Sequence, residues 1–166
     1  MRHFFQFILG LGLLGASLTL AHVQAFELTF EAQSAASFAQ PHDITVSPDQ
    51  RYLYVADNNN DRIAVLDPTS LVLLGSFAQG EVSEPHDVVF QADGKLLVAD
   101  TGNSRIAIYE VLGATGRFVG EIRGNFSRPE GVAVHPNGRL YVTGAGSNNI
   151  VVLDNGKSVA TAAGLS

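Results

Sequence analysis

Cysteine is absent from the 166 residues of this chain. Its absence excludes disulfide bonds, zinc-thiolate sites and cysteine nucleophiles, and it leaves the redox compartment open. A bound metal ion would therefore need histidine, aspartate, glutamate or carbonyl oxygen as ligands. The sequence also lacks a Gly-x-Ser-x-Gly motif, a phosphate-binding loop and a dinucleotide-binding fingerprint.

Basic residues are scarce, with ten Lys and Arg against sixteen Asp and Glu and a formal net charge of -6. This balance makes nucleic acids and anionic lipid surfaces poor partners. The hydrophobic fraction of 46% is nevertheless high enough for a packed core. The length fits one folded domain.

The first 25 residues have the pattern of a secretory signal peptide. Arg2 supplies positive charge, the apolar run Phe4 to Leu20 follows, and Val23-Gln24-Ala25 places small residues where a signal peptidase reads them. We predict cleavage after Ala25, with Ala21 as the second choice, and export to the periplasm or out of the cell. The alternative is an uncleaved membrane anchor, which would be the chain's only contact with a membrane.

A 44-residue repeat fills the rest of the chain. Its clearest mark is a triplet that begins with proline: Pro41-His42-Asp43, Pro85-His86-Asp87 and Pro129-Glu130-Gly131. Equal spacing over three copies is typical of a modular repeat architecture. The chain therefore divides into a signal peptide, a leader strand or linker, and three repeats (1–25, 26–40, 41–84, 85–128 and 129–166).

Each repeat contains four short runs of β-branched and aromatic residues with turn residues between them. In the second repeat the runs are Val88 to Phe90, Leu96 to Asp100, Arg105 to Tyr109 and Phe118 to Ile122. Such runs predict an all-β chain of four-stranded antiparallel sheets. At this period they are typical of β-propeller blades, in which the first strand lines a central channel. A β-sandwich is the competing architecture, but it does not require equal strand units.

The first two repeats resemble the NHL repeat, and the third resembles its YVTN relative. The residues that carry the likeness are Val55-Ala56-Asp57 with Asn60-Asp61-Arg62-Ile63, Val98-Ala99-Asp100 with Asn103-Ser104-Arg105-Ile106, and Tyr141-Val142-Thr143. The third copy departs from the pattern, because Gly144 replaces the strand-end Asp and Asn149 replaces the Arg. The resemblance implies a six-bladed propeller, of which three blades are half.

Three blades cannot close a propeller, which needs about four to eight. Two apolar blade faces would remain uncovered, and exposed patches of that size are unusual on soluble monomers. Three arrangements are possible: two chains pair into a six-bladed ring, the chain is a fragment of a longer propeller, or the blades persist as an open arc. The expected partner is a second copy of the chain or another protein.

His42 and His86 occupy the same place in successive repeats, and Glu130 takes that place in the third. Two imidazoles and a carboxylate at one height of the channel are a ligand set suited to zinc. The motif is similar to that of the peptidyl-hydroxyglycine amidating lyases, a likeness that implies zinc held by histidines after proline. The alternative is that the imidazoles hydrogen-bond backbone carbonyls and keep neighbouring blades in register.

Three further polar positions recur from repeat to repeat. They are Asp43 and Asp87, Asp57 and Asp100, and Arg62 and Arg105. We predict that the first pair accepts N–H groups where the strand starts, with calcium binding as the alternative. The second pair is expected to accept turn N–H groups, and the third to bridge to a neighbouring blade.

No assembled catalytic set is visible in the sequence. We therefore predict an exported propeller segment that binds a ligand or a protein, or serves as a scaffold. The alternative is a metal-dependent propeller enzyme with amidating-lyase-like or lactonase-like activity, in which His42, His86 and Glu130 hold zinc or calcium at the channel mouth.

Overall fold

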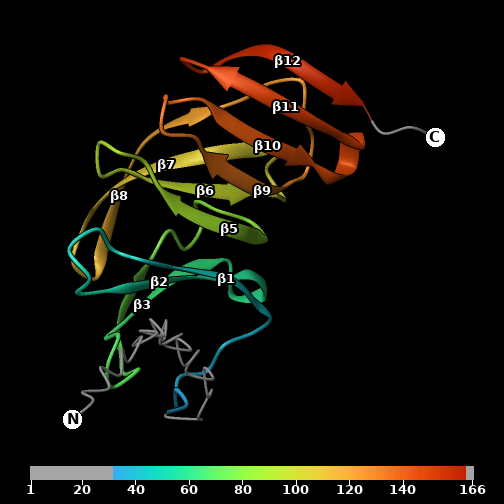
Figure 1. Cartoon of the computed structure of the whole chain (residues 1–166). Helices are drawn as coiled ribbons and strands as arrows, with labels where there is room; N and C mark the ends of the chain where they lie inside the picture. The colour runs from blue at the N-terminus through green and yellow to red at the C-terminus, as the bar shows by residue number, and fades with distance from the viewer. Residues whose placement is uncertain (1–31, 164–166) are drawn as a thin grey trace, which may run out of the picture. The chain divides into compact units, whose positions relative to one another are not determined.

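The computed structural model describes residues 32–163, which form three four-stranded antiparallel sheets (Figure 1). The first contains β1 (Pro41–Val46), β2 (Leu53–Asp57), β3 (Arg62–Leu66) and β4 (Leu73–Phe77), with the 3-10 turn η1 (Asn58–Asn60) after β2. The second contains β5 (Pro85–Phe90), β6 (Leu96–Asp100), β7 (Arg105–Leu112) and β8 (Thr115–Ile122). The third contains β9 (Pro129–Val134), β10 (Leu140–Gly144), the 3-10 turn η2 (Ala145–Ser147), β11 (Asn149–Asp154) and β12 (Lys157–Ala163).

Each sheet follows chain order, so every strand pairs with the next one along the sequence. The predicted class, all-β with four-stranded propeller blades, is confirmed. The predicted signal peptide (1–25) and residues 26–31 of the predicted leader strand or linker lie outside the described residues, and residues 32–40 form no strand. Within residues 32–163, no helix is long and apolar enough to cross a membrane.

The turn between the first two strands of each blade requires a left-handed residue. Gln50, Gly94 and Gly138 occupy this place, with φ values of 60°, 84° and 88°. Glycine adopts such a φ without a steric penalty, whereas glutamine does not. The first blade compensates with Ser47, whose hydroxyl accepts hydrogen bonds from the N–H groups of Arg51 and Tyr52.

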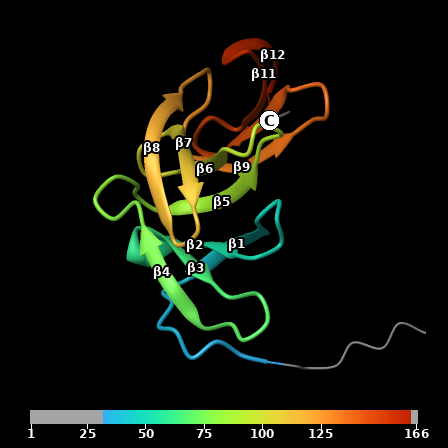
Figure 2. The same ribbon diagram turned by 90° about the vertical axis from the view of Figure 1, so that its left-hand side faces the viewer.

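The alternating residues of each strand point to the two sides of a blade, and the sides that face a neighbouring blade are buried. One core joins the first two blades and contains Tyr54, Ile63 and Val65 together with Val88, Leu96, Val98 and Tyr109. A second core joins blades two and three and contains Leu97, Ala99 and Ile106 together with Val132, Leu140, Val142 and Leu153. The first strands of the blades consequently lie side by side in the order β1, β5, β9 (Figure 2).

The second blade has a longer outer hairpin than the sequence predicts, because β8 begins at Thr115 rather than at Phe118. The hairpin tip reaches the first blade, where the Tyr54 hydroxyl donates a hydrogen bond of 2.7 Å to the Gly113 carbonyl. Gly116 packs so closely on the Phe77 ring that a Cβ atom would lie 2.4 Å from it. Contact with another blade, and not local strand propensity, therefore determines where this strand begins.

Candidate functional site

The site predicted from the repeats lies at the start of β1, β5 and β9, the strands that line the channel in a propeller. In all three, the residue before the first proline has a left-handed backbone: φ is 52° at Gln40, 49° at Glu84 and 45° at Arg128. The chain thus enters each strand through the same bend. This bend brings the residues that follow the prolines to equivalent positions in the three blades.

His42 and His86 are brought together, as the prediction required. Their ring centroids are 4.0 Å apart and the ring planes are inclined by 36°. Burial lowers the pKa of His86 below its usual value of 6.5, and the neighbouring His42 lowers it further, while Glu130 acts in the opposite direction. His86 is therefore a neutral imidazole at pH 7, with a nitrogen lone pair that can accept a proton.

A metal ion needs at least three converging ligands. Within residues 32–163, no group of three or more His, Asp or Glu side chains is arranged to hold a metal ion. The predicted set of His42, His86 and Glu130 contributes two adjacent imidazoles, with the Glu130 charge close enough to influence His86. The predicted set therefore lacks a third ligand that converges with the two imidazoles in residues 32–163, and the chemical steps proposed for this site use no metal.

An ion pair joins the residues that precede the prolines of the second and third blades. Arg128 donates to the Glu84 carboxylate at 2.7 Å, and the two residues are 44 positions apart. The two charges act on the pKa of His86 in opposite directions, Arg128 lowering it and Glu84 raising it. This pair is not among the predictions from the sequence, although the separation of its residues equals the repeat spacing of 44.

Asp43 and Asp87 link the blades of the channel wall. The Asp43 carboxylate accepts the Val88 N–H at 3.1 Å, and the Asp87 carboxylate accepts the Val132 N–H at 2.6 Å. Each carboxylate therefore binds the first strand of the next blade. The prediction that these residues accept N–H groups at a strand start is confirmed, but the strand that supplies the Val88 and Val132 N–H groups is that of the next blade.

The position of Asp87 between two blades strongly raises the pKa of its carboxyl group. Burial and a hydrogen bond with Asp43 raise its pKa to about 7, although the N–H groups of Val132 and Val88 favour the charged form. Asp87 therefore holds a proton for part of the time at neutral pH. In the third blade Gly131 takes the place of Asp43 and Asp87, so this blade has no carboxylate there. A Cβ atom at Gly131 would lie 2.9 Å from the Thr143 hydroxyl oxygen.

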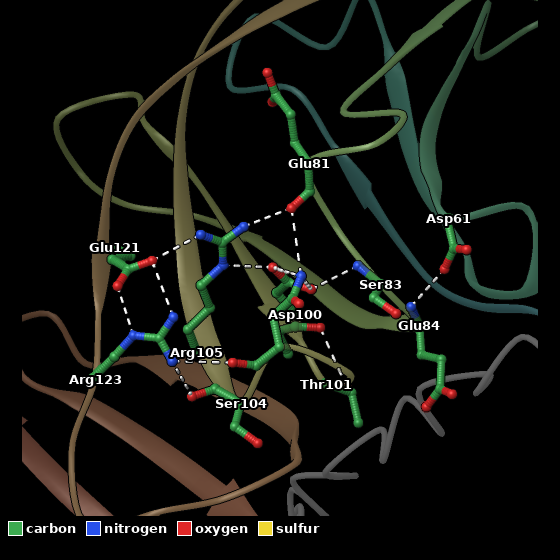
Figure 3. Close-up of polar contacts among 12 residues, drawn as sticks. Asp61, Glu81, Ser83, Glu84, Asp100, Thr101, Ser104, Arg105, Glu121 and Arg123 are labelled. Carbon is green, nitrogen blue, oxygen red and sulfur yellow. Dashed lines mark hydrogen bonds and ion pairs between the residues drawn. The ribbon is translucent and has the colours of Figure 1, made fainter.

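In the first two blades, the second strand ends at a buried aspartate that pairs with the proline at the start of the first strand. In the second blade, Asp100 accepts the Ser83 N–H at 2.8 Å, the Asn103 amide at 3.0 Å and the Arg105 guanidinium at 2.6 Å (Figure 3). Arg105 also binds the Glu121 carboxylate and the Glu81 carbonyl. The bond to Glu81 is the predicted bridge to the preceding repeat (41–84), and the ion pair with Asp100 of the same blade was not predicted.

The first blade repeats this arrangement with Asp57, Asn60 and Arg62. Asp57 also accepts the Ala39 N–H at 2.8 Å. In the third blade Gly144 and Asn149 replace the aspartate and the arginine, and the Asn149 amide binds the Asn125 carbonyl instead. These clusters hold the chain that enters each blade, so their role is structural.

The residue after each buried aspartate links consecutive blades. The Asn58 amide donates to the Pro85 carbonyl at 3.2 Å, and the Thr101 hydroxyl donates to the Pro129 carbonyl. Both acceptors are the prolines that precede the site residues. The buried polar residues therefore position the strands that carry His86 and Glu130.

A protein-family model described as "Lactonase, 7-bladed beta-propeller" matches residues 15–136, well over half of the chain. The chain belongs to this family. A second model, the NHL repeat, matches residues 126–153 of this lactonase-family propeller segment. The resemblance to NHL repeats is therefore confirmed, but the matched repeat is the third, which was expected to resemble the YVTN relative. The ring described for the family has seven blades rather than the six that the resemblance implied.

Solved structures show the same fold at low sequence identity. The periplasmic gluconolactonase of Pseudomonas aeruginosa matches with a TM-score of 0.61 and 19% identity over 73% of this chain and 39% of that one. The virginiamycin B lyase of Staphylococcus aureus matches with a TM-score of 0.61 and 13% identity, over 78% of this chain and 43% of that one. The hydrazine synthase of Kuenenia stuttgartiensis matches with a TM-score of 0.60 and 22% identity, over 80% of this chain and 39% of that one.

The chain spans about two fifths of the length of these solved structures. A comparison with curated protein sequences finds no match. The three neighbours named above have different activities, so the likeness establishes the propeller fold and leaves the chemistry to the residues of the site.

Proposed function

We propose that this lactonase-family propeller segment takes part in the hydrolysis of a lactone, with His86 as the general base. The observation that carries the proposal is the pair of adjacent imidazoles on channel-lining strands, in a chain whose family model is that of a lactonase. The neighbour named as a gluconolactonase supports a sugar lactone as the substrate class.

Hydrolysis of a lactone adds one water molecule and needs no redox partner. The base takes a proton from water while the water oxygen attacks the carbonyl carbon. The ring C–O bond then breaks, and the alkoxide that leaves receives the proton held by the base. The product is a hydroxy acid, which releases one proton to the solution at neutral pH.

The geometry supplies groups for these steps. His86 is neutral at pH 7 because its pKa is lowered, so it can accept the proton from water. We assign to Arg128, which pairs with the Glu84 carboxylate, the stabilisation of the negative oxygen of the tetrahedral intermediate. His42 lies against His86 and favours its neutral form.

The test is a measurement of acid release from glucono-δ-lactone at constant pH, corrected for the spontaneous reaction. We expect the purified protein to accelerate ring opening and His86→Ala to lower kcat by about 10² to 10⁴, the usual contribution of a general base. His135→Ala is the matched control, because His135 is an exposed residue of a turn outside the site. Absence of acceleration by the unaltered protein would overturn the proposal.

A second candidate is a binding or scaffold module without catalysis. It is favoured by an apolar groove on the first blade, lined by Phe38, Ile44, Leu53, Val55 and Leu66. Saturable binding of the lactone, seen by calorimetry without turnover, would support this candidate over the enzyme.

We also propose that the protein is exported. The pattern of residues 1–25 supports this, and one structural neighbour is named as periplasmic. N-terminal sequencing of the protein from the periplasm or medium should begin at Phe26. Recovery of the intact N-terminus in the membrane fraction would contradict the proposal.

A further inference from the structure

A cleft between the first and second blades lies at the other end of β1 from His42. Its volume is about 240 Å³, and its two walls are the turn that joins β1 to β2 and the tip of the β7–β8 hairpin. The six residues of β1 separate it from the start of that strand by roughly 17 Å. Side chains of both blades line the cleft, among them Asp49, Arg51, Tyr52, Phe90 and Leu112.

The first wall departs from the 44-residue repeat. Residues 47–52 join β1 to β2, whereas residues 91–95 and 135–139 join the corresponding strands of the other two blades, so the first blade has one residue more in this turn. The turn closes with a hydrogen bond from the Ser47 N–H to the Tyr52 carbonyl, where the other blades use the carbonyls of Lys95 and Arg139. An aromatic residue therefore stands where the other turns carry a basic one.

The second wall departs from the repeat as well. β7 contains eight residues, against five in β3 and six in β11. The tip of this longer hairpin reaches the first blade, where the Tyr54 hydroxyl binds the Gly113 carbonyl (Figure 2). A Cβ atom at Gly113 would lie 3.2 Å from the Tyr52 hydroxyl oxygen, so glycine allows the tip to approach the ring. The second and third blades pack together without either departure, so blade packing does not require them.

The cleft presents an aromatic ring beside hydrogen-bond donors. The central guanidinium carbon of Arg51 lies 5.7 Å from the centre of the Tyr52 ring, and its Nε donates to the Asp49 carboxylate at 2.8 Å. The Nη atoms of Arg51 have no hydrogen-bond partner within residues 32–163, and the side chain is 72% exposed. The Nη N–H groups therefore remain available to a ligand.

A charged acceptor lies next to these donors. Hydrogen bonds from the Ser47 hydroxyl and the Arg51 guanidinium lower the pKa of Asp49 to about 2, so this group is a carboxylate at neutral pH. Arg51 and Asp49 balance each other in charge, which favours a neutral ligand over an ion. On the opposite wall Leu112 is 84% exposed and supplies apolar surface.

We propose that this cleft binds one neutral pyranose ring, a monosaccharide or a single unit of a glycan, with the C–H face of the sugar on the Tyr52 ring. A sugar has an apolar face and an edge of hydroxyl groups that both donate and accept hydrogen bonds. Tyr52 and Leu112 match the face, while Arg51 donates and Asp49 accepts at the edge. The volume lies below the roughly 300 to 1,000 Å³ of pockets for drug-sized ligands, which suits a single ring. The proposal does not depend on lactone hydrolysis.

The test is an NMR titration of the labelled protein with the methyl glycosides of glucose, galactose and N-acetylglucosamine, none of which is a lactone. We expect at least one of them to bind with a dissociation constant of about millimolar order and to shift the N–H signals of Gly94 and Gly113, which line the cleft. Tyr52→Ala should raise the dissociation constant about tenfold or more. Tyr141→Ala is the matched control, since Tyr141 is a partly exposed tyrosine of the third blade.

Arg51→Ala provides a second variant on an exposed side chain, whose replacement leaves the packing of the blades intact. It should also weaken binding about tenfold, because the sugar hydroxyls lose a charged donor. Retention of full affinity by both Tyr52→Ala and Arg51→Ala would overturn the proposal. The absence of saturation with all three glycosides, or binding of glucose 6-phosphate alone, would overturn it too.

Two cross-measurements separate this site from the candidate site at His86. Sugar binding should persist in His86→Ala, and Tyr52→Ala should open glucono-δ-lactone at the rate of the parent protein. If the parent does not open the lactone, the glycoside titration still tests the cleft. Glycoside shifts confined to the residues around His42 and His86 would place the sugar in the channel and contradict the assignment to the cleft.

Discussion

Asp87 accepts the Val132 N–H at 2.6 Å across the boundary between the second and third blades. Asp43 makes the same bond to Val88 one blade earlier. The chain therefore uses one carboxylate per boundary to fix the height of the next channel strand. Asp87, which follows His86 of the candidate site, therefore also holds the second and third blades together.

The raised pKa of Asp87 predicts a pH-dependent stability. The folded protein holds this proton up to a pKa of about 7, whereas the unfolded chain releases it near 3.8. The group therefore stabilises the fold fully below pH 3.8, and this contribution is lost as pH rises toward 7 and beyond. Because Asp87 is half-buried, we expect a loss of about 1 to 2 kcal/mol between pH 5 and pH 8.

Asp87→Asn should remove this contribution, since the amide keeps an oxygen for the Val132 N–H and does not titrate. Urea unfolding at pH 5 and pH 8 provides the measurement, with the parent protein subtracted so that other titrating groups cancel. Asp154→Asn, at the exposed end of β11, is the control. An equal difference between variant and parent at both pH values would contradict the prediction.

The buried pair of Asp100 and Arg105 predicts a large loss of stability. The Asp100 side chain is 0% exposed, and its removal leaves the Arg105 guanidinium and the Ser83 N–H without that partner. We expect Asp100→Ala to lower the free energy of unfolding by about 3 to 5 kcal/mol. Asp154→Ala, which breaks an exposed pair with Arg139, should cost less than about 1 kcal/mol by the same measurement.

The turn at Gln50 predicts a stabilising substitution. Gln50 has a φ of 60°, and glycine stands at the equivalent place in the other two blades. Gln50→Gly should raise the free energy of unfolding by about 0.5 to 1 kcal/mol, because the relief of backbone strain exceeds the entropy lost by glycine. Gly94→Ala should act in the opposite direction. Thermal unfolding followed by circular dichroism distinguishes the two directions.

The contact between the imidazoles predicts coupled titration. His42→Ala removes a positive neighbour and exposes the His86 ring, and both changes should raise the pKa of His86. Glu130→Gln removes a negative neighbour and should lower it. Titration of the imidazole protons by NMR gives both values without an activity assay. Shifts of the same sign in the two variants would show that the electrostatic assignment is wrong.

The ligand geometry predicts the metal content. Because no group of three His, Asp or Glu side chains in residues 32–163 is arranged for a metal, we expect less than about 0.1 zinc or calcium per chain after purification without chelator. Elemental analysis gives this value. Stoichiometric zinc in the parent that disappears in His42→Ala and His86→Ala would instead establish the metal site predicted from the sequence.

Much of the fold follows from local sequence. The proline triplets at a spacing of 44 residues, with four β-branched runs after each, predicted three four-stranded sheets because strands of this kind pair with their neighbours in the chain. The adjacency of His42 and His86 followed from the same spacing, since equivalent positions in consecutive blades lie side by side. The strand-end aspartates are structural acceptors as predicted, but the prediction of turn N–H donors was wrong, because the backbone donors are Ala39 and Ser83 of the segments that enter the blades.

Other features depend on contacts between blades. The sequence determined the repeat, the strands and the position of each polar residue within its blade. Only the tertiary structure decided that Asp43 reaches Val88, that Arg128 pairs with Glu84, and that the β7–β8 hairpin extends to Tyr54. The physical reason is that hydrogen bonds, ion pairs and desolvation depend on distance through space, and residues of different blades acquire that proximity only when the sheets pack.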